Sequence, residues 1–142
     1  MAPKVKRSAS ETLPIPVEII ERRIFLIRGH KVMLDSDLAE LYAETTTRLN
    51  QQVRRNIDRF PDDFAFQLTQ DELDALILQI ATSKTGSGGR RKVPWGFAEQ
   101  GVAMLSSVLR GTRAVIVNIA IINAVIIIIA RVYQPLVDLL GE

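Results

Sequence analysis

The sequence predicts a small α+β domain, and three observations lead to this fold class. Two short apolar runs flank a glycine-containing pair near residue 29, a pattern typical of a β-hairpin. Two segments after the hairpin carry apolar residues at helical spacing and are separated by a short turn. Two further helical segments occupy the C-terminal part. Together they predict a single domain with an N-terminal hairpin, a helix-turn-helix and two C-terminal helices.

The amino-acid composition excludes several kinds of functional site. The 142 residues include 18 basic and 16 acidic side chains, for a net charge of +2. Without cysteine, disulfide scaffolds, thiolate metal sites and cysteine nucleophiles are excluded. The one histidine, His30, rules out a multi-histidine metal centre and has no evident catalytic partner. We therefore expect a protein that is not an enzyme and that binds no metal or cofactor.

The two ends of the chain predict tails around one domain. Residues 1–13 are polar and lack the apolar stretch of a signal peptide, so we expect a disordered tail and find nothing that points to secretion. The domain is expected to span residues 14–134. Pro135 is expected to end its last helix and to begin a short tail over residues 135–142.

The N-terminal hairpin is expected to pair Ile24–Arg28 with Lys31–Leu34 across a turn at Gly29-His30. Asp35 and Ser36 are good N-cap residues for a short amphipathic helix over 37–42.

A second helix is expected from Thr46 to about Ile57, with Thr45 as its cap. Its apolar residues Leu49, Val53 and Ile57 recur every four positions along one stripe. Phe60-Pro61 should end it.

The rest of the chain predicts one strand and three helices. A strand over 64–68 precedes a helix over 71–81 that Thr69 would cap. A glycine-rich basic loop then covers residues 84–92. The two C-terminal helices are expected over 97–109 and 112–132.

Positive charge is concentrated in two central segments. Arg48 to Arg59 holds four arginines and one acid, and Lys84 to Lys92 holds four basic residues and no acid. A local basic surface of this kind is typical of nucleic-acid binding, although a solvated basic face gives the same pattern.

The second helix of the helix-turn-helix carries the residue types that DNA recognition needs. Arginine pairs with guanine, and asparagine or glutamine pairs with adenine, through two hydrogen bonds each. Arginines toward its C-terminal end suit phosphates. The basic loop would act as a wing along the DNA backbone, or is simply mobile; a phosphate cradle is less favoured because no P-loop pattern is present. The DNA-binding candidates are Thr47, Arg48, Asn50, Gln51, Arg54, Arg55, Arg59, Arg90, Arg91 and Lys92.

Four segments in order resemble a known family: residues 32–42, 49–61, 63–68 and 97–109. They are similar to the KilA-N-like N-terminal DNA-binding domain of phage and prophage proteins, the type named after phage open reading frame six and associated with antirepressors. The resemblance covers roughly residues 17–125. It implies a small α+β domain in the bacterial cytoplasm that binds DNA in transcription regulation and is usually joined to a separate C-terminal domain.

The sequence departs from this family in two ways. Ala43 stands at a turn where similar domains carry glycine. Similar domains also tend to have polar residues near six positions, which here are Ile77, Leu78, Asn123, Ile127, Ile129 and Ala130.

The last helix has almost no polar face. Residues 114–130 comprise eight Ile, three Val, four Ala and two Asn. A core helix, a membrane span and a homo-oligomer interface are alternatives, and seventeen residues are short for a bilayer. We prefer a homo-oligomer, either an unusual natural one or a redesigned domain. The expected interface residues are Ile77, Leu78, Ile122, Val125, Ile126, Ile127 and Ile129.

Two functions follow. The first is sequence-directed binding of double-stranded DNA by a self-associating phage or prophage regulatory module. The alternative is an engineered or structural homo-oligomer in which DNA binding is incidental.

Overall fold

The structure is a computed structural model that describes residues 15–81 and 92–141. The predicted N-terminal tail and most of the basic loop, with Arg90 and Arg91, lie outside the described residues. The chain divides into two compact units. One, the sheet unit, runs from Arg23 to Leu109, and the other combines the chain up to Arg22 with the chain from Arg110 onward.

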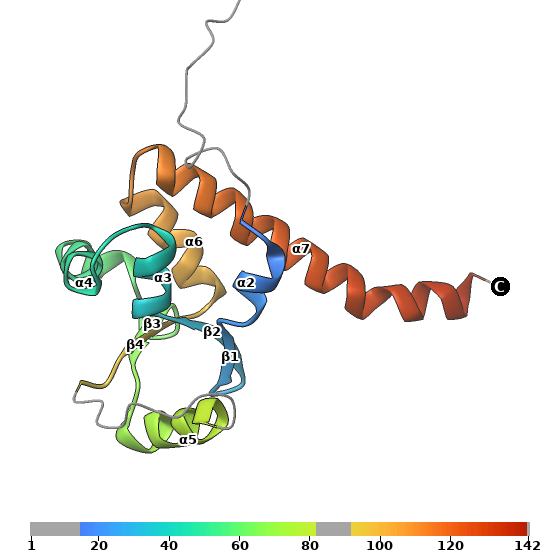
Figure 1. The fold of residues 1–142 in the computed structure, drawn as a ribbon, viewed down its shortest axis with the longest axis horizontal. Coiled ribbons are helices and arrows are strands. Elements are labelled where there is room, and N and C mark those ends of the chain that lie inside the picture. The colour runs from blue at the N-terminus through green and yellow to red at the C-terminus, as the bar shows by residue number, and fades with distance from the viewer. Residues whose placement is uncertain (1–14, 82–91, 142) are drawn as a thin grey trace, which may run out of the picture. The chain divides into compact units, whose positions relative to one another are not determined.

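The sheet unit is built on four antiparallel strands, which confirms the α+β fold class. Their order is β1-β2-β4-β3 (Figure 1). The strands are β1 (Ile24–Ile27), β2 (His30–Leu34), β3 (Ala65–Gln67) and β4 (Trp95–Phe97). The hairpin supplies one half of the sheet, and β4 and β3 complete the other half with paired residues 28 to 32 positions apart in the sequence.

The predicted hairpin is confirmed, but its turn lies one residue earlier than expected. Ile27 pairs with His30, so the turn is Arg28-Gly29 and His30 belongs to β2. Both turn residues have positive φ, 56° for Arg28 and 75° for Gly29. A two-residue turn that matches the twist of the strands requires this backbone, and glycine adopts it without strain.

Strand β4 is absent from the sequence prediction, which places residue 97 in a helix. The strand has three residues and contains Gly96, so it shows no apolar alternation. The glycine is needed because a Cβ there would lie 2.7 Å from a methyl of Val32. The helix that follows, α6, begins at Glu99 and ends at Val108.

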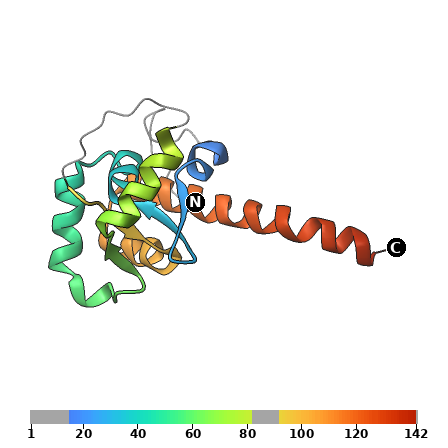
Figure 2. The same cartoon turned by 90° about the horizontal axis from the view of Figure 1, so that it is seen from below.

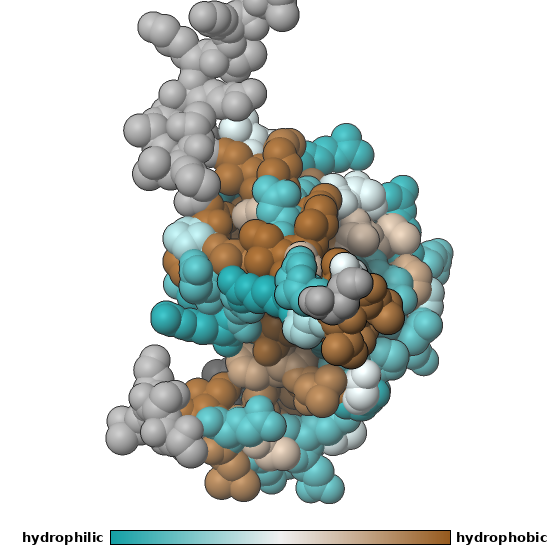
Figure 3. Space-filling view, turned by 90° about the vertical axis from the view of Figure 1, so that its right-hand side faces the viewer, coloured by the Kyte–Doolittle hydropathy of each residue, from teal (hydrophilic) through white to brown (hydrophobic). Residues whose placement is uncertain are grey.

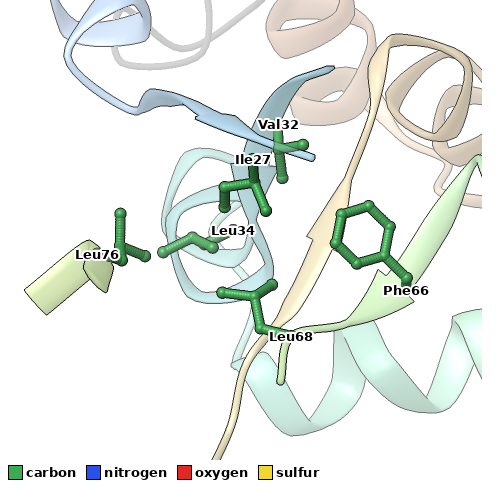
Figure 4. Close-up of a cluster of buried hydrophobic side chains, with 6 residues drawn as sticks. All are labelled: Ile27, Val32, Leu34, Phe66, Leu68 and Leu76. Carbon is green, nitrogen blue, oxygen red and sulfur yellow. The ribbon is translucent and has the colours of Figure 1, made fainter. Parts of the chain in front are cut away.

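One face of the sheet is closed by α5 (Gln70–Ala81). Six buried side chains from the strands and α5 point toward one another there, as Figure 4 shows: Ile27, Val32, Leu34, Phe66, Leu68 and Leu76. Helix α5 begins at Gln70, one residue before the predicted start, and Thr69 caps it as predicted: Thr69 Oγ1 accepts from the backbone N–H of Glu72 at 3.1 Å. The Glu72 carboxylate accepts from the backbone N–H of Thr69 at 2.8 Å, which completes a capping box.

Glu72 also ties α5 to the hairpin turn. Its two carboxylate oxygens accept from Arg28 Nε at 2.6 Å and Nη2 at 3.0 Å. The guanidinium of Arg28 lies 4.0 Å from the ring centroid of Phe66. The hydrogen bonds from Arg28, together with the capping bond from the Thr69 N–H, lower the pKa of the Glu72 carboxyl from 4.5 to about 2.

The opposite face of the sheet carries α3 (Asp35–Leu41) and α6, and α4 (Thr46–Arg55) packs against these two helices (Figure 1). Helix α3 begins at Asp35, so the expected cap at Asp35 and Ser36 is wrong: the N-cap residue is Leu34. Asp35 instead lies buried in the first turn, at 4% exposure.

The buried carboxylate of Asp35 joins three elements. One oxygen accepts from the backbone N–H of Ser36 at 2.7 Å. The other accepts from Asn50 Nδ2 on α4 at 2.9 Å and from the backbone N–H of Trp95 on β4 at 3.2 Å. A buried carboxylate is stable only when its oxygens have such donors. Asp35 therefore fixes α3 to α4 and to the inner strand β4.

The other unit contains α2 (Val17–Glu21) and α7 (Thr112–Leu140). Helix α2, which the sequence analysis does not predict, is only five residues long and packs against α7. Arg131 Nη1 donates to both carboxylate oxygens of Glu21, at 2.8 and 2.7 Å.

Helix α7 continues to Leu140, so the prediction that Pro135 ends it is wrong. Proline removes one backbone hydrogen bond but has a φ close to the helical value. A side-chain bond from Gln134 Nε2 to Asp138 Oδ1, 2.8 Å long, spans the proline. The helix is long and apolar enough to span a membrane by length and composition, with a mean hydropathy of 2.6 over its most apolar stretch.

Replacing Asp35 tests its role as the link. In Asp35→Asn, an amide NH₂ group replaces one carboxylate oxygen and can no longer accept from the N–H groups that face it. The free energy of unfolding should therefore fall by about 2–3 kcal/mol. Urea unfolding followed by Trp95 fluorescence measures this change. The matched control is Asp62→Asn at an exposed position, which should change it by less than about 0.5 kcal/mol. Equal stability of the two variants would contradict the assignment.

The Arg28–Glu72 pair predicts an acid dependence of stability. Because the folded pKa of Glu72 is depressed to about 2 from 4.5, its contribution is present above pH 4.5 and is lost as pH falls toward 2. Glu72→Gln should flatten the fall of the urea midpoint across that window. Asp71→Asn, an exposed neighbour on α5, serves as the control and should keep the steeper dependence of the parent.

Candidate nucleic-acid interface

Helix α4 is amphipathic, and its start is the one that the sequence predicts. The Thr45 hydroxyl accepts from the backbone N–H of Arg48 at 3.1 Å, which satisfies one of the free donors of the first turn. Leu49 and Val53 are buried, on the side that packs against α3 and α6. This packing leaves the opposite side of α4 free.

The end of α4 differs from the prediction. The helix ends at Arg55, and Asn56 Nδ2 donates to the backbone carbonyl of Gln52 at 2.8 Å. A 3₁₀ turn, η1 (Ile57–Arg59), follows, and the side chain of Ile57 is exposed. The buried stripe of α4 therefore includes Leu49 and Val53 but not Ile57, because the helical phase changes after residue 55.

Five of the predicted DNA-binding residues share one exposed side of the helix. We call this side the outer face of α4; it consists of Thr47, Arg48, Gln51, Arg54 and Arg55. Figures 1 and 2 both show α4 at the margin of the sheet unit. The spacing of three and four residues places these side chains along the length of the helix.

The outer face is positively charged. Helix α4 contains no acidic residue, and Arg54 and Arg55 lie in its last turn, where the helix dipole favours cations. In the described part of the chain neither of these two arginines forms an ion pair. Both guanidinium groups are therefore available to an anion.

Arg48 is the outer-face residue with an acidic neighbour. Its Nε lies 3.4 Å from a carboxylate oxygen of Glu44, one turn earlier. The Arg48 side chain is 73% exposed and that of Glu44 is 37% exposed, so solvent screens the pair and it adds little to stability. This pair was not predicted, although a four-residue spacing of Glu and Arg is the sequence signal for it.

Asn50 does not belong to the outer face. Its side chain is half-buried, and its amide donates to Asp35. The structure thus gives Asn50 a fixed position between α3 and α4, and an adenine would have to replace its bond to Asp35.

The four other predicted DNA-binding residues lie away from α4 or outside the described residues. Arg59 belongs to η1, and its Nη1 donates to Ser107 Oγ at 3.4 Å. Lys92 is exposed just before β4. Arg90 and Arg91 are outside the described residues, so the proposed wing has no described geometry.

The turn between α3 and α4 sets the orientation of the outer face. Ala43 has φ 59°, the left-handed conformation expected from the glycine of similar domains. The backbone N–H groups of Ala43 and Glu44 donate to the carbonyls of Glu40 and Ala39 at 3.1 and 2.8 Å. These bonds close the end of α3, and the chain then enters α4 within two residues.

The predicted interface residues are mostly exposed. Ile77 and Leu78 lie on α5, while Ile122, Ile126, Ile127 and Ile129 lie on α7. Val125 is half-buried. Large apolar side chains in such numbers are uncommon on the surface of a monomeric protein.

Comparison with known protein families matches residues 22–108 to the ORF6N domain. The matched segment includes the whole sheet, α3, α4 and α5. The same comparisons found no match among curated proteins or solved structures.

Proposed function

We propose that this chain, which belongs to the ORF6N domain family, binds double-stranded DNA through the outer face of α4. The family match is compatible with a phage regulatory module. The observation that carries the proposal is an exposed helix face with three arginines and no acid, held in place by the buried Asp35 carboxylate.

The proposed mode is that of a helix-turn-helix. Helix α3 would support α4, and α4 would enter the major groove, which is wide enough for one helix. Arg48 and Gln51 would read base edges, and Arg54 and Arg55 would contact phosphates. The rigid link through Asp35 supports this mode, because base reading needs side chains on a firmly positioned helix.

A second part of the proposal is that the chain self-associates through α7. The exposed isoleucines of this helix support it, since they would be covered in an oligomer. A symmetric assembly would present two outer faces to paired half-sites. The alternative function, a structural homo-oligomer with incidental DNA binding, rests on the same apolar helix.

We propose a biological role for this DNA binding as well. The resemblance to KilA-N-like, antirepressor-associated domains supports a role in transcription regulation in the cytoplasm of a bacterial host. DNA binding is the part of this assignment that the outer face of α4 supports directly.

Arg54→Gln tests the phosphate-binding role of the outer face. Binding to duplex DNA releases counterions, so the affinity of the parent should fall steeply with salt. The variant should bind every duplex more weakly and should lower the slope of log affinity against log salt by about one. Fluorescence anisotropy with labelled duplexes from low to physiological salt measures both effects.

The matched control is Lys31→Gln, which removes one exposed positive charge from β2 instead of α4. It should leave the salt slope unchanged. If the parent binds no duplex at low salt, the proposal is refuted. If Arg54→Gln and Lys31→Gln lose the same affinity for duplex DNA, the binding is a nonspecific attraction by net charge and does not use the outer face of α4.

Glu44→Gln tests the neighbour of Arg48. Removing the carboxylate frees Arg48 and takes a negative charge from beside the outer face, so affinity for duplex DNA should rise about threefold to tenfold at low salt. The same titration measures this rise, with Glu99→Gln on α6 as the charge-matched control. Weaker binding by Glu44→Gln would show that Glu44 positions Arg48 instead of opposing DNA.

A further inference from the structure

Eight of the twelve large apolar residues that α7 exposes follow a regular pattern along the helix. Successive members are separated alternately by four and three residues, from the first turn to the last. We call this row the α7 seam; it consists of Val115, Ile119, Ile122, Ile126, Ile129, Tyr133, Leu136 and Leu140. This spacing is the heptad repeat of a coiled coil, with its a and d positions apolar throughout.

Between Ala114 and Ala124, the face of α7 opposite the seam is buried. Ala114, Val117, Ile121 and Ala124 are buried and occupy the c and f positions of the same heptads. Arg131, also at an f position, binds Glu21 on α2. Along this stretch helix α7 has one buried face and a second apolar face that is exposed. Figure 3 views the molecule from the C-terminal end of α7, where hydrophobic residues reach the surface.

Charge is excluded from the seam and from its flanks. After Arg113, the charged residues of α7 are Arg131 and Asp138, and both lie at f positions, away from the seam. The e and g positions that flank the seam hold Ile, Val, Leu, Ala or Asn. A solvated helix of this length would carry charges on its exposed side, whereas a buried helix interface would not.

We propose that the α7 seam packs against the α7 seams of further copies of this chain to form a coiled coil. The inference rests on the self-association in the proposed function and names its surface. Pro135 falls at a c position, so the residue that interrupts the backbone hydrogen bonds lies outside the packed surface.

The area of the seam is sufficient for a stable interface. Its eight residues are between 47% and 83% exposed. At roughly 100 Å² of apolar surface for each side chain, the seam offers about 800 Å² per copy. Stable protein interfaces bury about 800 Å² per partner, so a second copy covers as much surface as association requires.

The residue types at the seam favour more than two helices. Isoleucine occupies both a positions (Ile119, Ile126) and d positions (Ile122, Ile129) in the middle of the seam. Isoleucine at both positions shifts coiled coils from dimers toward trimers and tetramers. Apolar e and g residues widen the strip that can be buried, which also favours more than two helices. The expected assembly therefore has three or four copies.

Two neighbouring isoleucines allow a matched test. Ile126 belongs to the seam, while Ile127, the next residue, is exposed at a b position outside it. Light scattering coupled to size exclusion on the full chain should give an oligomer of three or four copies for the parent. Ile126→Lys should give a monomer, Ile127→Lys should keep the parent mass, and Ile126→Leu should retain the oligomer.

Trp95 fluorescence shows whether each variant keeps a folded sheet unit, because this tryptophan lies in β4 and is the single one in the chain. An unchanged spectrum in Ile126→Lys, together with its monomeric mass, separates a lost interface from unfolding. If that variant unfolds, Ile119→Asn and Leu136→Asn should each lower the mass while the spectrum of the parent is kept.

The outcomes distinguish the seam from the proposal on which it rests. A monomeric parent refutes self-association as a whole. A parent oligomer that persists in Ile126→Lys, or that both lysine variants dissolve equally, refutes the seam alone. Partition of the parent into phosphatidylcholine vesicles, with no oligomer in buffer, assigns α7 to a bilayer and overturns the seam. The test does not depend on DNA binding, because Arg54→Gln should weaken DNA binding and leave the mass of the oligomer unchanged.

Discussion

The arrangement of the sheet unit depends on one buried carboxylate. Asp35 accepts hydrogen bonds from its own helix, from Asn50 on α4 and from the backbone of β4, so a single group sets the positions of three elements. Because Trp95 lies sixty positions from Asp35 in the sequence, its hydrogen bond to this carboxylate forms only when β4 has joined the sheet. The orientation of α4, and of the arginines on its outer face, is a consequence of that one group.

Two helices of the chain show how the free side of an element determines what it is able to bind. Helix α4 buries Leu49 and Val53 and leaves arginines and a glutamine outside, a surface for an anionic and hydrogen-bonding partner. Helix α7 also buries one stripe, but its free side is apolar, a surface for another apolar surface. The two functions proposed for the chain therefore use different helices and different forces.

Much of the fold was predictable because local signals and tertiary packing agree. Thr45 and Thr69 cap the helices that follow them, and the left-handed Ala43 stands where similar domains carry glycine. Strand β4 was not predictable from its residues, since a three-residue strand containing Gly96 is recognised only by its partners on both sides. For the site, the spacing of residues 47–55 identified the outer face, but the burial of Asn50 depends on a residue fifteen positions away. The proline signal failed in α7, where the helix continues through Pro135.

The central claim is that the outer face of α4 meets the duplex, and chemical-shift mapping tests it most directly. Titration of the ¹⁵N-labelled chain with duplex DNA should shift the backbone and side-chain N–H signals of Thr47, Arg48, Gln51, Arg54 and Arg55. The signals of α5, on the opposite face of the sheet, should remain in place. Shifts that concentrate on α5 or the hairpin while α4 stays unchanged would contradict the account.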